Sequence, residues 1–174
     1  HGFKADTRRK RGAIARETMR AHQPDAAALS AITGMDPSIA PVVHARVGKK
    51  LEQEAIEDFR IDFEDGYGYH SEAEEDAHAS ESAAQLARAM RDGTLSPFIG
   101  IRIKPLSTKS SPRAMRTLDL FLSTLLTETG ALPANFVVTL PKVTVPAPVR
   151  ALDTLLRDIE ARFELPPRGM QMET

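Results

Sequence analysis

A strand-like segment places three carboxylates at the point where it breaks into glycine. The segment runs Phe59-Arg-Ile-Asp-Phe-Glu-Asp-Gly-Tyr-Gly68. Because side chains on a strand alternate between two faces, Asp62 and Glu64 are predicted to point one way and Asp65 the other way, with the apolar residues. A buried carboxylate costs several kcal/mol unless a cation or hydrogen-bond donors receive it. The segment therefore predicts a polar site at the carboxyl end of a strand, with a half-solvated edge strand as the alternative.

Composition limits the classes of protein that this chain can belong to. Its 174 residues, 41% of them apolar, suffice for one domain with a core. A net charge of −1 provides no field that would attract nucleic acid. The sequence contains no cysteine, which excludes disulfides, thiolate nucleophiles and Cys-ligated zinc. No apolar run is long enough for a membrane span and no signal peptide is recognisable, so we expect a cytoplasmic protein.

Helices and strands are predicted to alternate along the chain. Residues 1–57 are expected to form a helical segment, and residues 58–174 a β/α series. Helices are predicted over about 8–22, 25–34, 43–51 and 71–91, and then from Pro112 and from Pro148. Strands are predicted at residues 60–64, 98–103, 136–140 and 170–173. Apolar strands separated by amphipathic helices are typical of a parallel sheet that helices cover.

Polar residues at the strand ends help to choose between a barrel and an open sheet. The first strand ends in Glu-Asp-Gly, the second carries Arg102 and Lys104, the third runs into Lys142 and the fourth ends in Glu173. Such residues build the active site of a (β/α)8 barrel. No Gly-x-Gly-x-x-Gly or Walker A sequence follows a strand, which counts against a nucleotide-binding open sheet. We therefore predict an α/β fold, a TIM barrel of which this chain covers roughly four strands. Because a full barrel needs about 250 residues, we expect a piece of a longer protein.

Four motifs stand at these strand ends, in order, over about residues 60–174. They are Ile61-Asp-Phe-Glu-Asp-Gly66, Ile101-Arg-Ile103, Val138-Thr-Leu-Pro-Lys-Val143 and Met172-Glu-Thr174. They resemble the Asp-x-Glu-Asp, Val-Arg-Val/Ile-Asn, Leu-Pro-Lys-Val and Ile-Glu-Thr strands of the citrate lyase beta-subunit-like aldolases, the HpcH/HpaI aldolase family. Lys104-Pro105 stands where that family usually has Asn, which places this chain in a divergent branch.

The resemblance implies an enzyme that binds Mg2+, or Mn2+ in its place, and makes or breaks a carbon–carbon bond beside a carbonyl. Its substrates would be small carboxylic acids of the 2-keto acid type or acyl-CoA thioesters. Carried over by motif, Glu173 would be a metal ligand and Arg102 would bind the substrate carboxylate or enolate oxygen. Glu64 and Asp65 would lie beside the metal-bound waters and hold Arg102 in place.

The residue types also fit this chemistry by themselves. An enolate needs positive charge at its oxygen, which Mg2+ and a guanidinium supply. Arginine grips a carboxylate through two donors, which lysine does not. The alternative for Arg102 is a structural ion pair with Asp62 or Glu64. Lys142 and Tyr67 are further candidates for substrate contact; a rim salt bridge and simple packing are their respective alternatives.

Two other functions stay open at this stage. One is that the protein has the family's barrel but acts as a non-catalytic scaffold or regulatory subunit. The other is that it is an open α/β domain that binds a ligand. The expected partners are a small-molecule carboxylic acid or acyl-CoA substrate and further copies of the chain as a homo-oligomer. Neither nucleic acid nor a membrane is expected as a partner.

Overall fold

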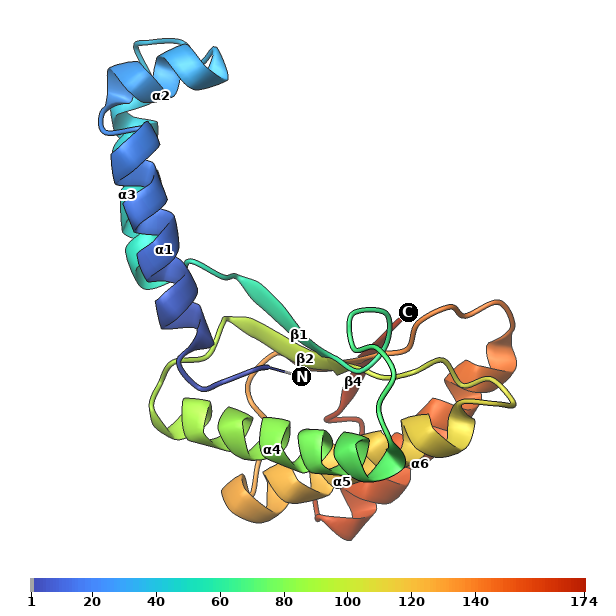
Figure 1. The fold of residues 1–174 in the computed structure, drawn as a ribbon. Coiled ribbons are helices and arrows are strands. Elements are labelled where there is room, and N and C mark those ends of the chain that lie inside the picture. The colour runs from blue at the N-terminus through green and yellow to red at the C-terminus, as the bar shows by residue number, and fades with distance from the viewer. Residues whose placement is uncertain (1) are drawn as a thin grey trace. The chain divides into compact units, whose positions relative to one another are not determined.

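Four parallel strands form one sheet and follow each other in the order of the sequence. The strands are β1 (Asp58–Asp62), β2 (Phe98–Arg102), β3 (Phe136–Thr139) and β4 (Gln171–Glu173). In register, Ile61 lies opposite Ile101, which lies opposite Val138. The structure is a computed structural model that describes residues 2–174 (Figure 1). It confirms the predicted series of adjacent parallel strands.

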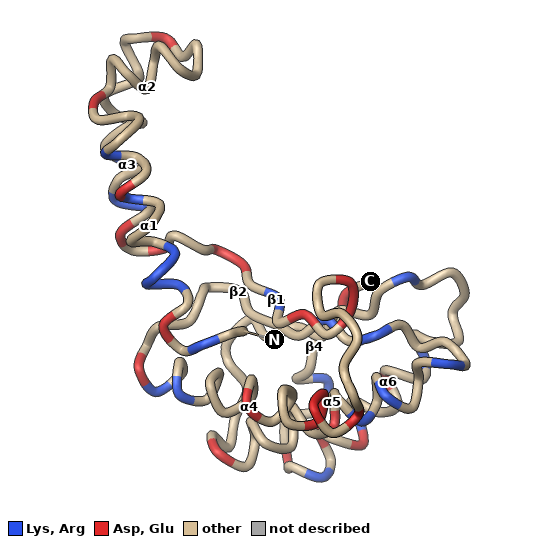
Figure 2. The backbone as a smooth tube through the Cα atoms, viewed as in Figure 1, with Lys and Arg blue, Asp and Glu red and all other residues tan. Residues whose placement is uncertain are grey.

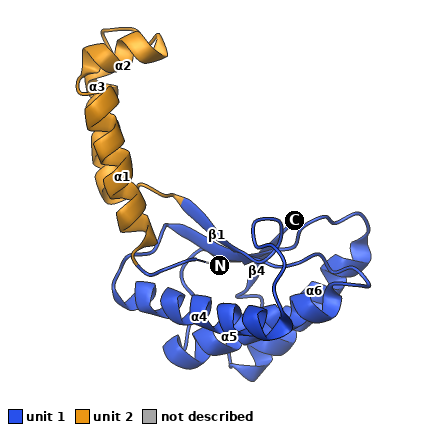
Figure 3. Ribbon diagram, in the orientation of Figure 1, with its two compact units in different colours: residues 1–5, 58–174 blue, residues 6–57 orange. Residues whose placement is uncertain are grey.

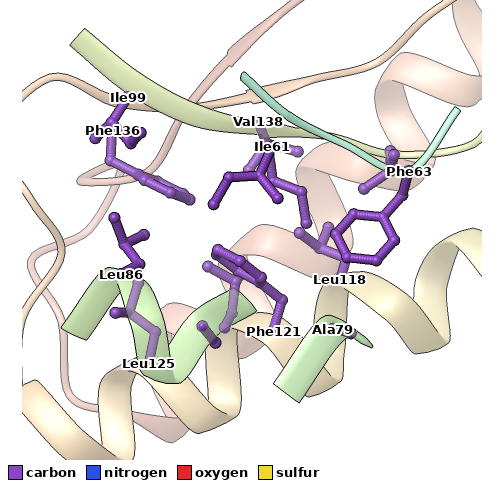
Figure 4. Packing of buried hydrophobic residues seen from close by; sticks show 14 of the residues in the cluster. Ile61, Phe63, Ala79, Leu86, Ile99, Leu118, Phe121, Leu125, Phe136 and Val138 are labelled. Atoms are coloured by element: carbon purple, nitrogen blue, oxygen red, sulfur yellow. The ribbon is translucent and has the colours of Figure 1, made fainter. Parts of the chain in front are cut away.

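Helices cover one face of this sheet. The helix α4 (Glu72–Arg91) follows β1, α5 (Ser111–Thr129) follows β2 and α6 (Pro146–Arg162) follows β3, and Figure 1 shows all three on the same side. Ile61, Ile99 and Phe136 point from the strands toward Leu86 and Phe121 of the helices (Figure 4). The alternate strand residues occupy the other face, which none of these helices covers. The fold is thus mixed α/β, as predicted.

The first strand ends two residues earlier than predicted, at Asp62. The Asp62 carboxylate accepts the backbone N–H groups of Glu64 and Gly66, each at 2.9 Å, which turns the chain out of the sheet. The alternation of faces therefore stops before Asp65. Contrary to the prediction, Asp65 does not point with the apolar residues: it is exposed and lies in the turn.

The chain divides into two compact units (Figure 3). One is the helical segment Asp6–Glu57, and the other comprises the described residues up to Ala5 together with Asp58–Thr174. In the unit that contains the sheet, Phe3 packs on Phe59 with ring centroids 5.4 Å apart. The Ala5 N–H donates to Gln85 at 3.1 Å. These contacts explain why the start of the chain belongs with the sheet.

The helical unit contains α1 (Thr7–His22), α2 (Ala26–Thr33) and α3 (Ala40–Gln53). The helix α3 packs against both others. Gly12 allows close approach, because a Cβ at this position would lie 3.0 Å from both the Ala55 Cβ and the Leu51 carbonyl oxygen. The Asp25 side chain caps α2, as its place before the helix predicts.

Acidic and basic residues are interspersed along the backbone of both units (Figure 2), in keeping with a net charge of −1. Among residues 2–174, none of the helices combines the length and the apolarity that a membrane span requires.

Candidate active site at the carboxyl edge of the sheet

Arg102 and Asp62 end neighbouring strands and are paired in register. The Arg102 guanidinium donates from Nε to Asp62 Oδ1 at 2.8 Å and from Nη2 to Oδ2 at 2.6 Å. The hydrogen bond from Arg102 lowers the pKa of Asp62 to about 2, and the same bond raises the pKa of Arg102. Arg102 thus lies on the open face of the sheet with the carboxylate partner that the sequence predicted.

The Glu64 carboxylate is the most deeply buried acidic group at this edge, with only 4% of its side chain exposed. Its Oε1 forms an ion pair with Lys142 Nζ. Its Oε2 lies 3.8 Å from Arg102 Nε and accepts no hydrogen bond from any described residue. An unsatisfied buried acceptor costs about 1–3 kcal/mol, so each such group needs an explanation. Glu64 Oε2 is therefore placed to accept a hydrogen bond or a proton from a bound molecule.

Lys142 lies just after β3 and contacts both acids of the β1 turn. Besides Glu64, it donates to Asp65 Oδ1 at 2.8 Å, and this bond raises the pKa of Lys142 and lowers that of Asp65. Lys142 adopts a left-handed backbone with φ 56°, which is unfavourable for a residue other than glycine. The ammonium group remains accessible, since 58% of the side chain is exposed. The rim salt bridge is present, and Lys142 is still within reach of a ligand.

Tyr67 follows the same turn but packs into the protein. Its residue surface is 2% exposed, and its ring lies 5.1 Å from that of Phe63. The hydroxyl bonds to His78 Nδ1 at 2.8 Å. Burial raises the pKa of Tyr67 to about 12. Of the two interpretations that the sequence left open for Tyr67, packing agrees better with this burial than substrate contact does.

A partly buried ion pair beneath the site joins Lys104, one of the predicted strand-end residues, to Glu75, which was not predicted. Lys104 Nζ donates to Glu75 at 2.8 Å and to the carbonyl of Phe63 at 3.2 Å. Glu75 is 4% exposed and also accepts the Thr117 hydroxyl at 2.7 Å. The pair therefore fixes the backbone immediately before Glu64. The place of Lys104 at the end of a strand was its sequence signal, whereas Glu75 gave none because it lies in a helix of mostly exposed acids.

Glu173 faces a different partner from the one expected. Its two oxygens accept from Arg60 Nε at 2.9 Å and Nη2 at 3.1 Å, and Arg60 lowers the pKa of Glu173. Within residues 2–174, no group of three or more His, Cys, Asp or Glu side chains is arranged to hold a metal ion. While it is bonded to Arg60, the Glu173 carboxylate does not fit the role of a magnesium ligand.

These observations define a mixed α/β protein with a charged site at the carboxyl edge of a parallel sheet. The chain belongs to the family described as "Domain of unknown function (DUF6986)", whose sequence model matches residues 1–174. No curated protein and no solved structure matches the chain.

Proposed function

We propose that the chain forms about four strands of a (β/α)8 barrel and acts as a carbon–carbon lyase of the HpcH/HpaI aldolase, or citrate lyase beta-subunit-like, type. Three features support the barrel: the parallel strand order, the placement of the helices on one face, and the charged residues on the opposite face. In a barrel this opposite face would be the interior, and the carboxyl edge would be the active-site mouth. The resemblance of the four strand-end motifs supports the reaction type.

The main support for a catalytic site is the unsatisfied Glu64 oxygen beside Arg102. A fixed guanidinium 3.8 Å away and an ammonium on the other oxygen surround a buried carboxylate. Positive groups of this kind bind a substrate carboxylate and stabilise an enolate oxygen. A buried carboxylate with one free oxygen is suited to carry a proton to or from that substrate.

The proposed reaction cleaves a carbon–carbon bond in a substrate that carries a hydroxyl group two carbons away from a carbonyl group. Glu64 takes the proton of the substrate hydroxyl, the carbon–carbon bond breaks and an aldehyde or ketone leaves. The bonding electrons remain on the other fragment as an enolate, whose oxygen Arg102 binds. Glu64 then returns the proton that it took from the hydroxyl to the enolate carbon, which gives the 2-keto acid or acyl thioester. Asp62 orients Arg102 and stays ionised at neutral pH, because its pKa is about 2.

Magnesium or manganese would supply additional positive charge at the enolate oxygen. Because Glu173 is occupied by Arg60, we assign no step of this reaction to a metal. A cytoplasmic location and a homo-oligomeric state remain predictions.

A non-catalytic protein with the same fold is the second candidate. The Arg60–Glu173 ion pair favours it, because that pair engages the carboxylate that the resemblance makes a metal ligand. Such a protein would bind a carboxylate ligand at Arg102 without converting it.

The test is to incubate the natural protein, with Mg2+ present, with 4-hydroxy-2-keto acids and with 3-hydroxyacyl-CoA thioesters, and to follow the products by NMR. We expect cleavage of one class, loss of cleavage in Glu64→Gln, and normal cleavage in Arg162→Gln. Arg162 is a matched control because it bonds Asp119 between α5 and α6, away from the site. Binding without cleavage would support the second candidate, and neither binding nor cleavage would contradict both.

A further inference from the structure

Arg60 on β1 reaches Glu173 on β4 across the two strands that lie between them. The contact has two parallel N–H···O bonds, at 2.9 and 3.1 Å, which is the strong bidentate form of an arginine–carboxylate pair. Thr139 on β3 also donates its hydroxyl to Glu173. Asp58 contacts Arg60 from the same strand face. The two ends of the sheet are thereby joined by a charged bridge over its open face.

Gly100 on β2 provides the path for this bridge. A Cβ at Gly100 would lie 3.1 Å from Arg60 Cδ and 2.2 Å from the Val137 carbonyl oxygen. Any side chain at this position would displace the Arg60 chain or the neighbouring strand. The crossing therefore depends on a specific residue of the sheet, in addition to the two charged groups themselves.

Ions from solvent can reach the bridge. Arg60 and Glu173 both line a surface hollow of about 900 Å3. The exposed fraction is 43% for the Glu173 side chain and 22% for that of Arg60. The Glu173 carboxylate is accordingly available for exchange of one cationic partner for another.

We propose that Arg60 is a built-in counter-ion that occupies the place of a divalent cation at Glu173. A guanidinium is permanently charged, and its planar fork covers both carboxylate oxygens. Mg2+ and Mn2+ bind through the same oxygens, so guanidinium and metal compete for one carboxylate. The native protein consequently binds a divalent ion weakly at Glu173, and removal of the guanidinium strengthens that binding. This competition does not depend on lyase activity.

The test is a Mn2+ titration of the natural protein, followed by electron paramagnetic resonance, with Mg2+ as the competitor. Four proteins are compared: native, Arg60→Gln, Arg60→Gln/Glu173→Gln, and Arg162→Gln. Arg162→Gln controls for the loss of one positive charge elsewhere in the same unit. We expect Arg60→Gln to bind Mn2+ roughly tenfold more tightly than native, because a unit charge in contact with the carboxylate is removed. The double variant should lose this gain, and Arg162→Gln should match native.

Two results would overturn the proposal. The first is an Arg60→Gln variant that binds Mn2+ no more tightly than Arg162→Gln. The second is a gain that persists in the double variant, which would place the ion away from Glu173. Loss of folding cannot imitate the expected outcome, because it would not tighten binding. The titration can support or contradict this proposal even if the lyase assay shows no activity, so the two proposals are tested separately.

Discussion

Lys142, on the segment after β3, forms an ion pair with Glu64, on the turn after β1, so the two chain segments are joined across the end of β2. Lys142 adopts this position with a left-handed backbone at φ 56°. The side chain thus satisfies one oxygen of a buried carboxylate at the expense of local backbone strain. Substitutions at position 142 can therefore separate the contribution of the backbone conformation to stability from the contribution of the charge.

The left-handed backbone predicts an order of stability among variants of Lys142. Both Lys142→Gly and Lys142→Ala remove the ammonium, but only glycine accepts a positive φ without steric cost. We expect Lys142→Ala to have the lower free energy of unfolding, by about 1 kcal/mol, in urea titrations. Equal values for the two variants would show that position 142 is not held in this conformation.

Arg102→Lys should abolish most of the activity while the fold survives. Lysine retains the charge but cannot reproduce the two-pronged bond to Asp62 and at the same time face a ligand. We expect kcat/KM to fall by roughly a hundredfold or more with little change in the melting temperature. The conservative control is Arg162→Lys on the helical face, which should keep native activity. Full activity of Arg102→Lys would remove the guanidinium from the mechanism.

The Asp62 pKa of about 2 predicts how stability depends on pH. Because the pKa is lower in the folded state, the stabilisation is complete above the unfolded value near 4 and is lost as pH falls through about 2. Between about pH 6 and pH 3 this group should account for a loss of about 1 kcal/mol. Asp62→Asn should show a correspondingly smaller loss than native over this interval. If the free energy of unfolding falls by the same amount in native protein and in Asp62→Asn over this pH interval, the lowered pKa is not that of Asp62.

The buried Lys104–Glu75 pair predicts a non-additive pair of substitutions. Lys104→Met alone leaves Glu75, which is 4% exposed, with Arg113 at 3.8 Å as its remaining cationic neighbour, and should cost about 2 kcal/mol in the free energy of unfolding. Glu75→Leu added to Lys104→Met removes the under-compensated carboxylate and should recover part of this loss. A double variant with the summed loss of both single variants would show that the groups act independently.

The elements of this fold could be predicted from the sequence because their signals are local. Apolar runs such as 98–103 and the capping residue Asp25 depend on near neighbours in the chain. The end of β1 was misplaced because the Asp62 side chain captures two backbone N–H groups, which an alternating pattern does not reveal. Arg60 and Glu173 lie far apart in sequence, and no periodicity links them.

Charged residues at the ends of parallel strands were predicted to converge at one edge of the sheet, and Arg102 and Glu64 do so, with Arg102 Nε 3.8 Å from Glu64 Oε2. The buried environment of Glu75 was missed, because Glu72 and Glu74 in the same helix are exposed and share its local pattern. Which member of an acidic run is buried depends on the helix face that meets Lys104 and Thr117.

Hydrogen exchange at the carbon beside a substrate carbonyl is the decisive test of the proposed enolate chemistry. The natural protein is incubated in D2O with pyruvate, as a simple 2-keto acid, and separately with acetyl-CoA, and deuterium entry into the methyl group is followed by NMR. We predict exchange with one of these probes, loss of exchange in Arg102→Lys and Glu64→Gln, and native exchange in Arg162→Gln. No exchange with either probe, or an undiminished rate in Glu64→Gln, would contradict the proposed active site.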